Sequence, residues 1–314
     1  MASIEREFYF TSFGAAGEIY ARSFFPENYK EVKAIIQITH GMAEHTDRYV
    51  HFAHFLNDEG FGVYMHDHLG HGKSSENDEQ LGFFGETDGY KTLVEDVKQL
   101  TDIIKKENED KRVILFGHSM GSFIARSFCE KYGNEIDGAV FCGTSGSNPG
   151  ALIGKKIADY VAKRNGPHFR SEFINSLAFS SYNKRIKPSR TEFDWLTRDN
   201  LVVDDYINDP KCGFLFTAAG YRDLFTLLHS VSKRIWYANV PYALPILLIA
   251  GEADPVGSYG KGVKEVAKLL RDTDHNDVTT KLYPDSRHEI LNELNKDEVY
   301  SHVSEWVNEI LSKR

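Results

Sequence analysis

The chain has 314 residues, of which 41% are hydrophobic and 26% charged, so it suits one large soluble α/β domain or a core domain with an inserted subdomain. Its net charge of −9 argues against general attraction to nucleic acid or to an anionic membrane surface. Cys129, Cys142 and Cys212 are unevenly spaced, and no apolar signal segment opens the chain. We therefore expect free thiols, no disulfide framework and a cytoplasmic location.

The first half of the chain alternates between strand and helix patterns. Period-two alternation on both sides of a glycine-rich turn at 14–17 predicts an N-terminal hairpin. Short β-branched runs then predict strands buried on both faces, separated by amphipathic helices. The expected strands are 6–13, 18–25, 32–40, 62–68, 112–118 and 138–143, and the expected helices are 49–56, 89–107 and 119–132. Such alternation predicts right-handed crossovers and a mostly parallel sheet.

The alternation of strand and helix patterns stops after Gly146 and resumes near residue 241. No run between these points has the character of a buried strand, so residues 147–240 are predicted to form a mainly helical cap inserted into a core of residues 1–146 and 241–314. We expect most of the cap aromatics to form its core and a minority to line an acyl tunnel. These aromatics are Phe169, Phe173, Phe179, Phe193, Trp195, Phe214, Phe216 and Phe225. The resumed pattern predicts strands in 245–254 and 277–286, with helices at 262–270 and 297–311.

The stretch "VILFGHSMGS", residues 113–122, places one serine between two glycines directly after a predicted strand. In a G-x-S-x-G elbow the serine occupies a sharp strand-to-helix turn that exposes its hydroxyl at the C-terminal end of the sheet. The following helix directs its N-terminal N–H groups at developing negative charge. The motif in this setting predicts that Ser119 is a nucleophile, whereas the alternative is a glycine-rich turn with an idle serine.

A nucleophilic serine needs a base, and the base needs a carboxylate. His288 follows the last predicted strand, and Asp254 follows the strand before it. The order Ser119, Asp254, His288 is that of α/β-hydrolases. Glu252 is the rival acid, and we prefer Asp254 because it lies further into the loop.

An oxyanion hole is expected from two backbone N–H groups. The first belongs to Met120, directly after the nucleophile. The second should lie just past the strand ending at His40, where Gly41 permits a tight turn and Met42 is placed to donate.

Five motifs together resemble the monoacylglycerol lipase and lysophospholipase family of serine α/β-hydrolases, across residues 32–312. They are "HGMAEHTDRY", "HDHLGHGKS", "GHSMG", "GEADPVG" and "YPDSRHEILNE". The resemblance implies an α/β-hydrolase fold with a mostly parallel eight-stranded sheet, a helical cap after the sixth strand and no cofactor. It also assigns the triad to Ser119, Asp254 and His288, and the oxyanion roles to Met42 and Met120. Ser122 departs from the family pattern, which often has a third glycine there.

Three other signals favour simpler interpretations. Seven histidines between His40 and His71 suggest a metal site, but the glycines of "DHLGHGKS" explain that stretch as a turn, so no metal is expected. Cys142 is interpreted as a small buried hydrophobe rather than a second nucleophile. The basic segment 183–190 is either a solvated face of the cap or a transient contact with a membrane surface or a phosphate head group.

The sequence therefore predicts a serine hydrolase that cleaves a lipid ester, either a monoacylglycerol or a lysophospholipid. One alternative is a small-ester esterase or a serine aminopeptidase-like amide hydrolase, which would need an acidic pair to hold the substrate amine. Another is a non-catalytic receptor on the same scaffold, which would tolerate loss of a triad member. A haloalkane dehalogenase is disfavoured because it needs a carboxylate at the position of Ser119.

Overall fold

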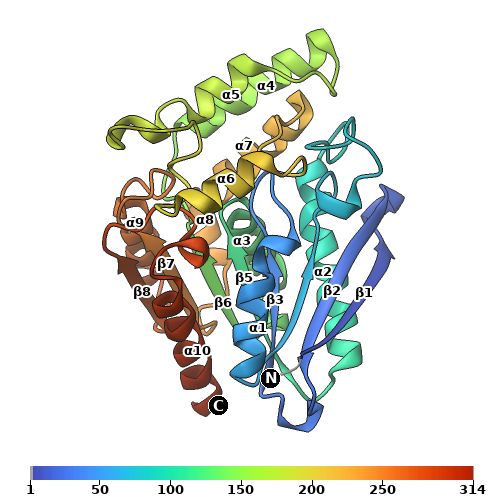
Figure 1. Ribbon diagram of the computed structural model, residues 1–314, viewed down its shortest axis with the longest axis vertical. Helices are drawn as coiled ribbons and strands as arrows, with labels where there is room; N and C mark the ends of the chain where they lie inside the picture. The colour runs from blue at the N-terminus through green and yellow to red at the C-terminus, as the bar shows by residue number, and fades with distance from the viewer. Residues whose placement is uncertain (1–2, 314) are drawn as a thin grey trace.

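The computed structural model describes residues 3–313, which fold around one sheet (Figure 1). In the described part of the chain the sheet has eight strands in the order β1-β2-β4-β3-β5-β6-β7-β8. The strands are β1 (Ser3–Thr11), β2 (Glu18–Pro26), β3 (Ala34–Thr39), β4 (Gly62–His66), β5 (Arg112–His118), β6 (Gly138–Cys142), β7 (Ile246–Gly251) and β8 (Val278–Tyr283).

The pairing of the strands confirms the predicted fold class. β1 and β2 form the expected antiparallel hairpin, and β2 joins β4 in an antiparallel pair. Every other pair, from β4 through to β8, is parallel. The C-terminal ends of these parallel strands lie along one edge of the sheet, which is where open α/β sheets place their sites.

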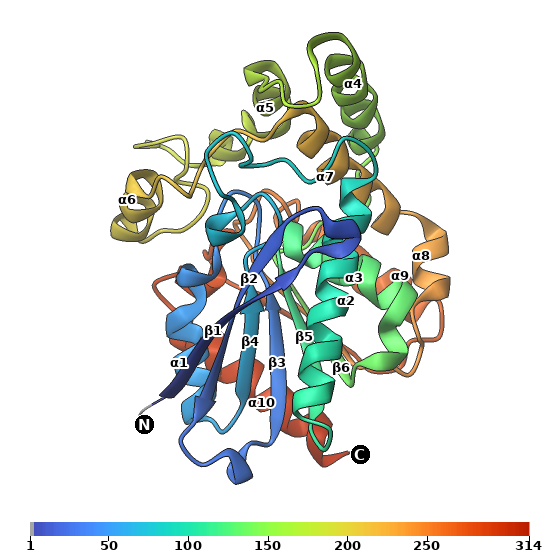
Figure 2. The same ribbon diagram turned by 90° about the vertical axis from the view of Figure 1, so that its right-hand side faces the viewer.

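Helices cover both faces of the sheet (Figure 2). Buried side chains of α1 and α10 form one hydrophobic cluster on the sheet, and those of α2, α3 and α9 belong to a cluster on the opposite face. The core helices are α1 (Val50–Asp58), α2 (Gly89–Glu107), α3 (Met120–Tyr132), α9 (Lys261–Arg271) and α10 (Lys296–Ser312). Because both faces are covered, all residues of β3, β6 and β7 are buried, which explains why they read as continuous apolar runs.

Five helices lie between β6 and β7, in the segment predicted to be helical. They are α4 (Gly150–Asn165), α5 (Glu172–Phe179), α6 (Asn200–Asn208), α7 (Ala218–Val231) and α8 (Arg234–Asn239). α4 and α5 lie at the top of Figure 1, α4 packs on α7, and α7 packs on α2 and α3. α8 packs against α3 and α9, so the domain boundaries at 147 and 240 stay a prediction. Residues 1, 2 and 314, which that prediction includes, lie outside the described residues.

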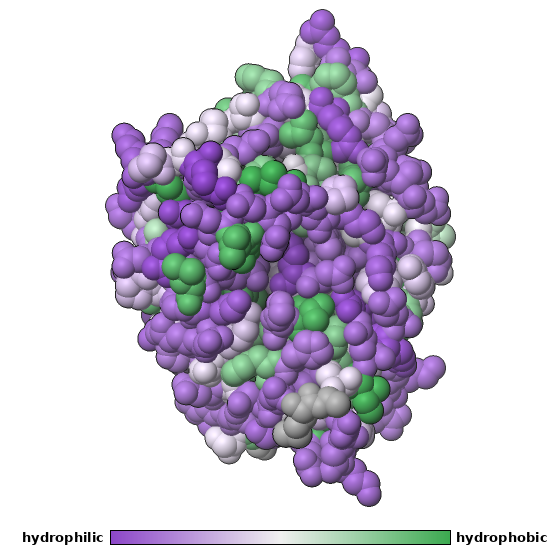
Figure 3. Space-filling model, in the orientation of Figure 1, coloured by the Kyte–Doolittle hydropathy of each residue, from purple (hydrophilic) through white to green (hydrophobic). Residues whose placement is uncertain are grey.

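The outer part of the cap carries exposed apolar side chains. On α4, α5 and the segment that joins them these are Leu152, Ile153, Tyr160, Phe169, Phe173 and Leu177. Green patches lie in the upper half of the face drawn in Figure 3. Each helix of the described chain is nevertheless too short or too polar to cross a bilayer.

Candidate active site

Ser119 lies at the junction of β5 and α3 in a strained backbone conformation. Its φ of 53° and ψ of −120° fall outside the regions that non-glycine residues favour. The turn leaves its side chain partly exposed at the C-terminal edge of the sheet, and Met120 begins α3 directly after it. The sequence motif therefore forms the predicted strand-turn-helix elbow.

The two glycines of the motif are required by close backbone approaches. A Cβ on Gly117 would collide with the carbonyl oxygen of Gly121, and a Cβ on Gly121 would collide with the carbonyl oxygen of Thr39. A backbone carbonyl has no flexible end that could move aside. These contacts explain why small residues flank Ser119 on both sides.

The structure brings Ser119, His288 and Asp254 together from three separate loops. The Nε2 atom of His288 lies 2.8 Å from Oγ of Ser119, and its Nδ1 atom lies 3.0 Å from Oδ1 of Asp254. The Val256 N–H donates to the same Asp254 oxygen at 2.8 Å and fixes the carboxylate. Asp254 and His288 are almost completely buried, whereas the rival acid Glu252 is exposed and lines a different hollow.

The loop that carries Met42 is held by contacts on both sides. Ala43 has a positive φ of 51°, and its N–H donates to Nε2 of His71 at 3.2 Å. Its carbonyl oxygen accepts from the Gly213 N–H and the Tyr206 hydroxyl, both at 3.0 Å. Met42 and Met120 line the same cavity as Ser119, as an oxyanion hole requires. As the first residue of α3, Met120 has an N–H without an intrahelical partner.

Ser122, the departure from the family pattern, supports the elbow from behind. Its Oγ donates to the carbonyl oxygen of Ser119 at 2.6 Å. This residue does not line the cavity, so its hydroxyl acts on the turn rather than on a substrate.

A buried charged network that the sequence analysis did not single out adjoins the serine. Arg48 donates to both carboxylate oxygens of Glu289 at 2.6 Å and to Glu44 at 2.8 Å. The other Glu44 oxygen accepts from the Tyr49 hydroxyl at 2.8 Å and lies 3.2 Å from Nδ1 of His118. In the sequence, only their places beside predicted site residues could have pointed to this network. Glu44 and Arg48 belong to "HGMAEHTDRY", His118 precedes Ser119, and Glu289 follows His288.

The network affects the protonation of Glu44 and His118, which lie beside Ser119. Burial works against the charged form of Glu44, but the His118 hydrogen bond and the Arg48 charge hold the pKa of this carboxyl well below its usual range. Burial likewise opposes the charge on His118, yet the hydrogen bond to Glu44 raises the pKa of the imidazole above its usual value. Arg48 thus compensates the charges of Glu44 and Glu289, and Glu44 favours the protonated form of His118 beside Ser119.

A cavity of about 1000 Å³ opens above Ser119 and extends under the cap. Five of the eight cap aromatics line it, which is more than the expected minority, although these five also pack in hydrophobic clusters as expected. They are Phe179, Phe193, Trp195, Phe214 and Phe225. Phe216 is fully buried, whereas Phe169 and Phe173 face outward. Where α4 packs on α7, Gly154 lies against the ring of Phe225, and a Cβ at this glycine would collide with that ring.

The cap also holds the loop that carries His288. The His288 N–H donates to the carbonyl oxygen of Trp195 at 3.3 Å, and the Glu289 N–H donates to that of Leu196 at 2.7 Å. The guanidinium of Arg287 donates to the carbonyl oxygens of Asp194 and Thr197. The segment 194–197 therefore forms one wall of the site and a support for His288.

The clustered histidines, Cys142 and the basic segment 183–190 were also candidates from the sequence. Each of these packs against or pairs with neighbouring residues. His40, His66, His68 and His71 are buried with their rings in contact, and the His68 N–H donates to Nε2 of His40 at 2.9 Å. Cys142 is fully buried in a hydrophobic cluster, where burial raises the pKa of its thiol well above the usual value. In the basic segment, Arg190 pairs with Asp204 and Arg185 lies over the ring of Tyr259, while Lys184 and Lys187 are exposed.

Comparisons with known proteins identify the family of this chain. The family model described as "Serine aminopeptidase, S33" matches residues 30–295. The monoglyceride lipase of Mus musculus is 29% identical over 280 residues, covering 88% of this chain and 82% of that protein. The monoacylglycerol lipase of Mycolicibacterium smegmatis is 28% identical, covering 88% of each chain.

A solved structure is also similar over nearly the whole length. It is a highly thermostable carboxyl esterase from Bacillus coagulans in complex with glycerol, with a TM-score of 0.92 and 32% identity, covering 98% of this chain and 99% of that one. The chain therefore belongs to the serine aminopeptidase S33 family of α/β-hydrolases and is a carboxylic ester hydrolase.

Proposed function

We propose that the protein cleaves lipid esters, most favourably monoacylglycerols or lysophospholipids, through an acyl-enzyme on Ser119. The observation that carries this proposal is the contact of Ser119 Oγ with His288 Nε2 at 2.8 Å, on the floor of a cavity lined by aromatic rings. A hydroxyl is a weak nucleophile at neutral pH, and a base at hydrogen-bond distance is what activates it.

In the first half of the reaction, Oγ of Ser119 attacks the ester carbonyl while Nε2 of His288 takes the hydroxyl proton. Asp254 orients the imidazole and stabilises the imidazolium that forms. The N–H groups of Met42 and Met120 stabilise the oxyanion of the tetrahedral intermediate. The intermediate collapses when His288 returns the proton to the leaving alcohol, which leaves the acyl group on Ser119.

Water completes the cycle by the same route. His288 removes a proton from the water, the resulting hydroxide attacks the acyl carbonyl, and Ser119 leaves with that proton as the carboxylic acid is released. Each proton removed is returned, so the residues of the site end the cycle as they began it.

The cavity supports a substrate with an apolar chain and a polar alcohol. Cap aromatics and the aliphatic side chains of Leu224 and Leu228 supply an apolar wall for an acyl chain. Glu44 and His118 line the same cavity beside the nucleophile, where they suit the hydroxyl groups of an alcohol product.

An amide substrate with a free amine is less well supported. Aminopeptidase chemistry needs an acidic pair, and Glu44 and Glu289 are two buried acids that line the same cavity as Ser119. Arg48 already lies between them and pairs with both carboxylates. Glu172 and Glu192 also line the cavity, but both are solvent-exposed.

We also propose that the protein acts in the cytoplasm. Cys129, Cys142 and Cys212 are buried free thiols, which suits a reducing compartment. The exposed apolar side chains of α4 and α5 support transient contact of the cap with a membrane surface during lipid uptake.

The test is a hydrolysis panel at equal concentrations, below any critical micelle concentration. It contains monoacylglycerols, lysophospholipids, short p-nitrophenyl esters and aminoacyl amides. We expect kcat/KM to be highest for one of the two lipid classes and lowest for the amides. Preference for amides, or for short esters over every lipid, would overturn the proposed substrate class.

A further inference from the structure

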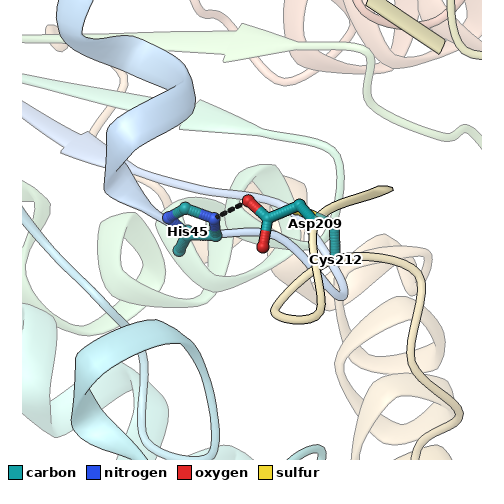
Figure 4. Close-up of side chains that lie close together, drawn as sticks. All are labelled: His45, Asp209 and Cys212. Carbon is teal, nitrogen blue, oxygen red and sulfur yellow. Dashed lines mark hydrogen bonds and ion pairs between the residues drawn. The ribbon is translucent and has the colours of Figure 1, made fainter. Parts of the chain in front are cut away.

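His45, Asp209 and Cys212 come together outside the catalytic triad, although His45 is 164 residues from Asp209 in sequence. His45 lies in the loop after β3, and the other two lie in the loop between α6 and α7 (Figure 4). Nε2 of His45 is 2.8 Å from Oδ2 of Asp209. One ligand atom from each side chain lies within 4.8 Å of the other two.

The sequence "DPKC" explains why Asp209 and Cys212 face the same way. The Cys212 N–H donates to the carbonyl oxygen of Asp209 at 3.0 Å, which closes a four-residue turn with a proline at its second position. The Lys211 N–H donates to Oδ1 of Asp209 at 2.8 Å, so that Oδ2 is the oxygen turned to His45. The pair is therefore preorganised by its own backbone.

The imidazole of His45 is oriented from the other side. Its Nδ1 lies 3.5 Å from Oδ2 of Asp47, and Asp47 in turn pairs with Arg22. Almost every metal-ligating histidine donates its other ring N–H to a carboxylate, a backbone carbonyl or water, and Asp47 lies where it could accept from Nδ1 of His45. His45 and Cys212 are 6% and 8% exposed, whereas the side chain of Asp209 is 33% exposed and leaves a path for entry.

We propose that His45, Asp209 and Cys212 bind a divalent transition metal, with Zn²⁺ as the expected ion and water as its fourth ligand. An imidazole nitrogen, a carboxylate oxygen and a thiolate are all accepted by Zn²⁺ in tetrahedral sites. Bonds of about 2.0 to 2.3 Å place tetrahedral ligands roughly 3.3 to 3.8 Å apart. Shifts of about 1 Å or less achieve this from the observed positions. On binding, Nε2 of His45 gives up the proton that it shares with Asp209, and the thiol of Cys212 loses its proton, both to solvent. Asp209 and the thiolate together then balance the charge of the ion.

A metal ion bound by these three residues would join the cap to the loop that carries Met42, one of the two proposed oxyanion donors. The Gly213 N–H, directly after Cys212, already donates to the carbonyl oxygen of Ala43, directly after Met42. A metal held by His45 and the 209–212 turn adds a second and stronger link across the same gap. Bound Zn²⁺ therefore stabilises the folded cap, independently of which ester the enzyme cleaves.

The experiment uses Co²⁺ as a spectroscopic probe and Zn²⁺ in calorimetry, on full-length protein freed of chelatable metal and of any histidine tag. We expect one Co²⁺ per chain, with tetrahedral d–d bands and a thiolate-to-cobalt charge-transfer band. Excess Zn²⁺ should abolish these bands and raise Tm by about 5 °C at a hundredfold excess over Kd.

Variants separate this site from other histidines. Cys212→Ser should abolish the charge-transfer band, and Asp209→Asn and Asp47→Asn should each weaken Co²⁺ binding about 10- to 100-fold. Cys129→Ala, which removes another buried thiol, should leave the band and the affinity unchanged. Circular dichroism of the metal-free variants checks their fold. If Cys212→Ser is unstable, the Asp209→Asn variant still tests the site, because the Asp209 side chain is one-third exposed. Absence of the band in wild-type protein, or equal Zn²⁺ affinity in all variants, would overturn the proposal.

Discussion

The indole ring of Trp195 lies against the imidazole ring of His288, with centroids 5.0 Å apart and planes inclined by 39°. The two residues come from different parts of the chain, because Trp195 belongs to the cap and His288 follows β8. Phe179 and Tyr182 pack on the other sides of the indole ring. The cap therefore supplies an aromatic face to His288, which becomes positively charged in the mechanism that we propose.

Replacing Trp195 should slow the chemical step rather than weaken binding alone. A cation over an aromatic face is stabilised by about 0.5 to 2 kcal/mol, and the imidazolium of His288 forms only as the transition state is approached. We expect Trp195→Leu to lower kcat roughly 2- to 30-fold, while Trp195→Phe retains most of it. Steady-state kinetics on one lipid ester measures this, and equal losses in both variants would assign Trp195 to packing alone.

Ser119 should be the residue that reacts with a fluorophosphonate. We expect one label per wild-type chain and none in Ser119→Ala, because the hydroxyl is the attacking group. Ser122→Ala is the matched control, since this hydroxyl contacts only the elbow backbone, and it should still be labelled. Intact-protein mass spectrometry counts the labels, and a labelled, folded Ser119→Ala protein would refute the assignment.

Asp254 and Glu252 should differ sharply although they are two residues apart. Asp254 Oδ1 lies 3.0 Å from Nδ1 of His288, whereas the side chain of Glu252 is exposed to solvent and lines a different hollow. Asp254→Asn should reduce kcat by about 10⁴, as in other triads, because the imidazole loses the carboxylate that sets its tautomer. Glu252→Gln should stay within about twofold of wild type. The reverse ranking in kcat measurements would identify Glu252 as the acid.

Activity should rise with acyl chain length if the aromatic cavity holds the chain. Each methylene removed from water contributes about 0.8 kcal/mol, or roughly fourfold, when the transition state retains it. Lengthening an ester from four to eight carbons should then raise kcat/KM about a hundredfold before a plateau. Phe225→Ala, which removes one wall ring, should flatten this dependence. A flat series in the wild type would leave a small-ester hydrolase.

Acid should destabilise the protein through its buried histidines. Burial lowers the pKa of His71 to about 4 and the pKa values of His40, His66 and His68 well below the usual range. Between pH 6.5 and 4 the unfolded chain binds protons that the folded protein excludes, so the free energy of unfolding falls as pH falls. Each such histidine contributes up to about 1.4 kcal/mol per pH unit.

His66→Leu isolates one of these contributions. Neither ring nitrogen of His66 has a hydrogen-bond partner among the described residues, so an apolar replacement costs little near pH 8. Asp96, with a pKa raised to about 7 mainly by burial, acts in the opposite direction in wild type and variant alike. The variant should therefore gain stability relative to wild type as pH falls from 6.5 to 5 in urea titrations. A constant difference across that range would show that His66 does not carry the effect.

Sequence by itself determined the strands and helices of the core and predicted the nucleophile, because both depend on local chemistry. Period-two and apolar runs predicted the strands, and the helix predicted at 89–107 has those bounds in α2. Two glycines around Ser119 predicted a turn whose strain and close approaches are properties of a few neighbouring residues. His288 and Asp254 could also be predicted from the sequence, because each follows a strand and the C-terminal ends of parallel strands meet at one edge of the sheet.

Only the tertiary structure decided how the cap faces the core. Its aromatic rings follow no single period, so sequence could not separate Phe216 in the interior from Phe214 and Phe225 at the cavity wall. The contact of Trp195 with His288 and the cluster of His45, Asp209 and Cys212 join segments about 90 and 164 residues apart. Such pairings depend on how α4 to α7 pack over the sheet. That packing is a sum of many weak, non-local contacts that no short stretch of sequence encodes.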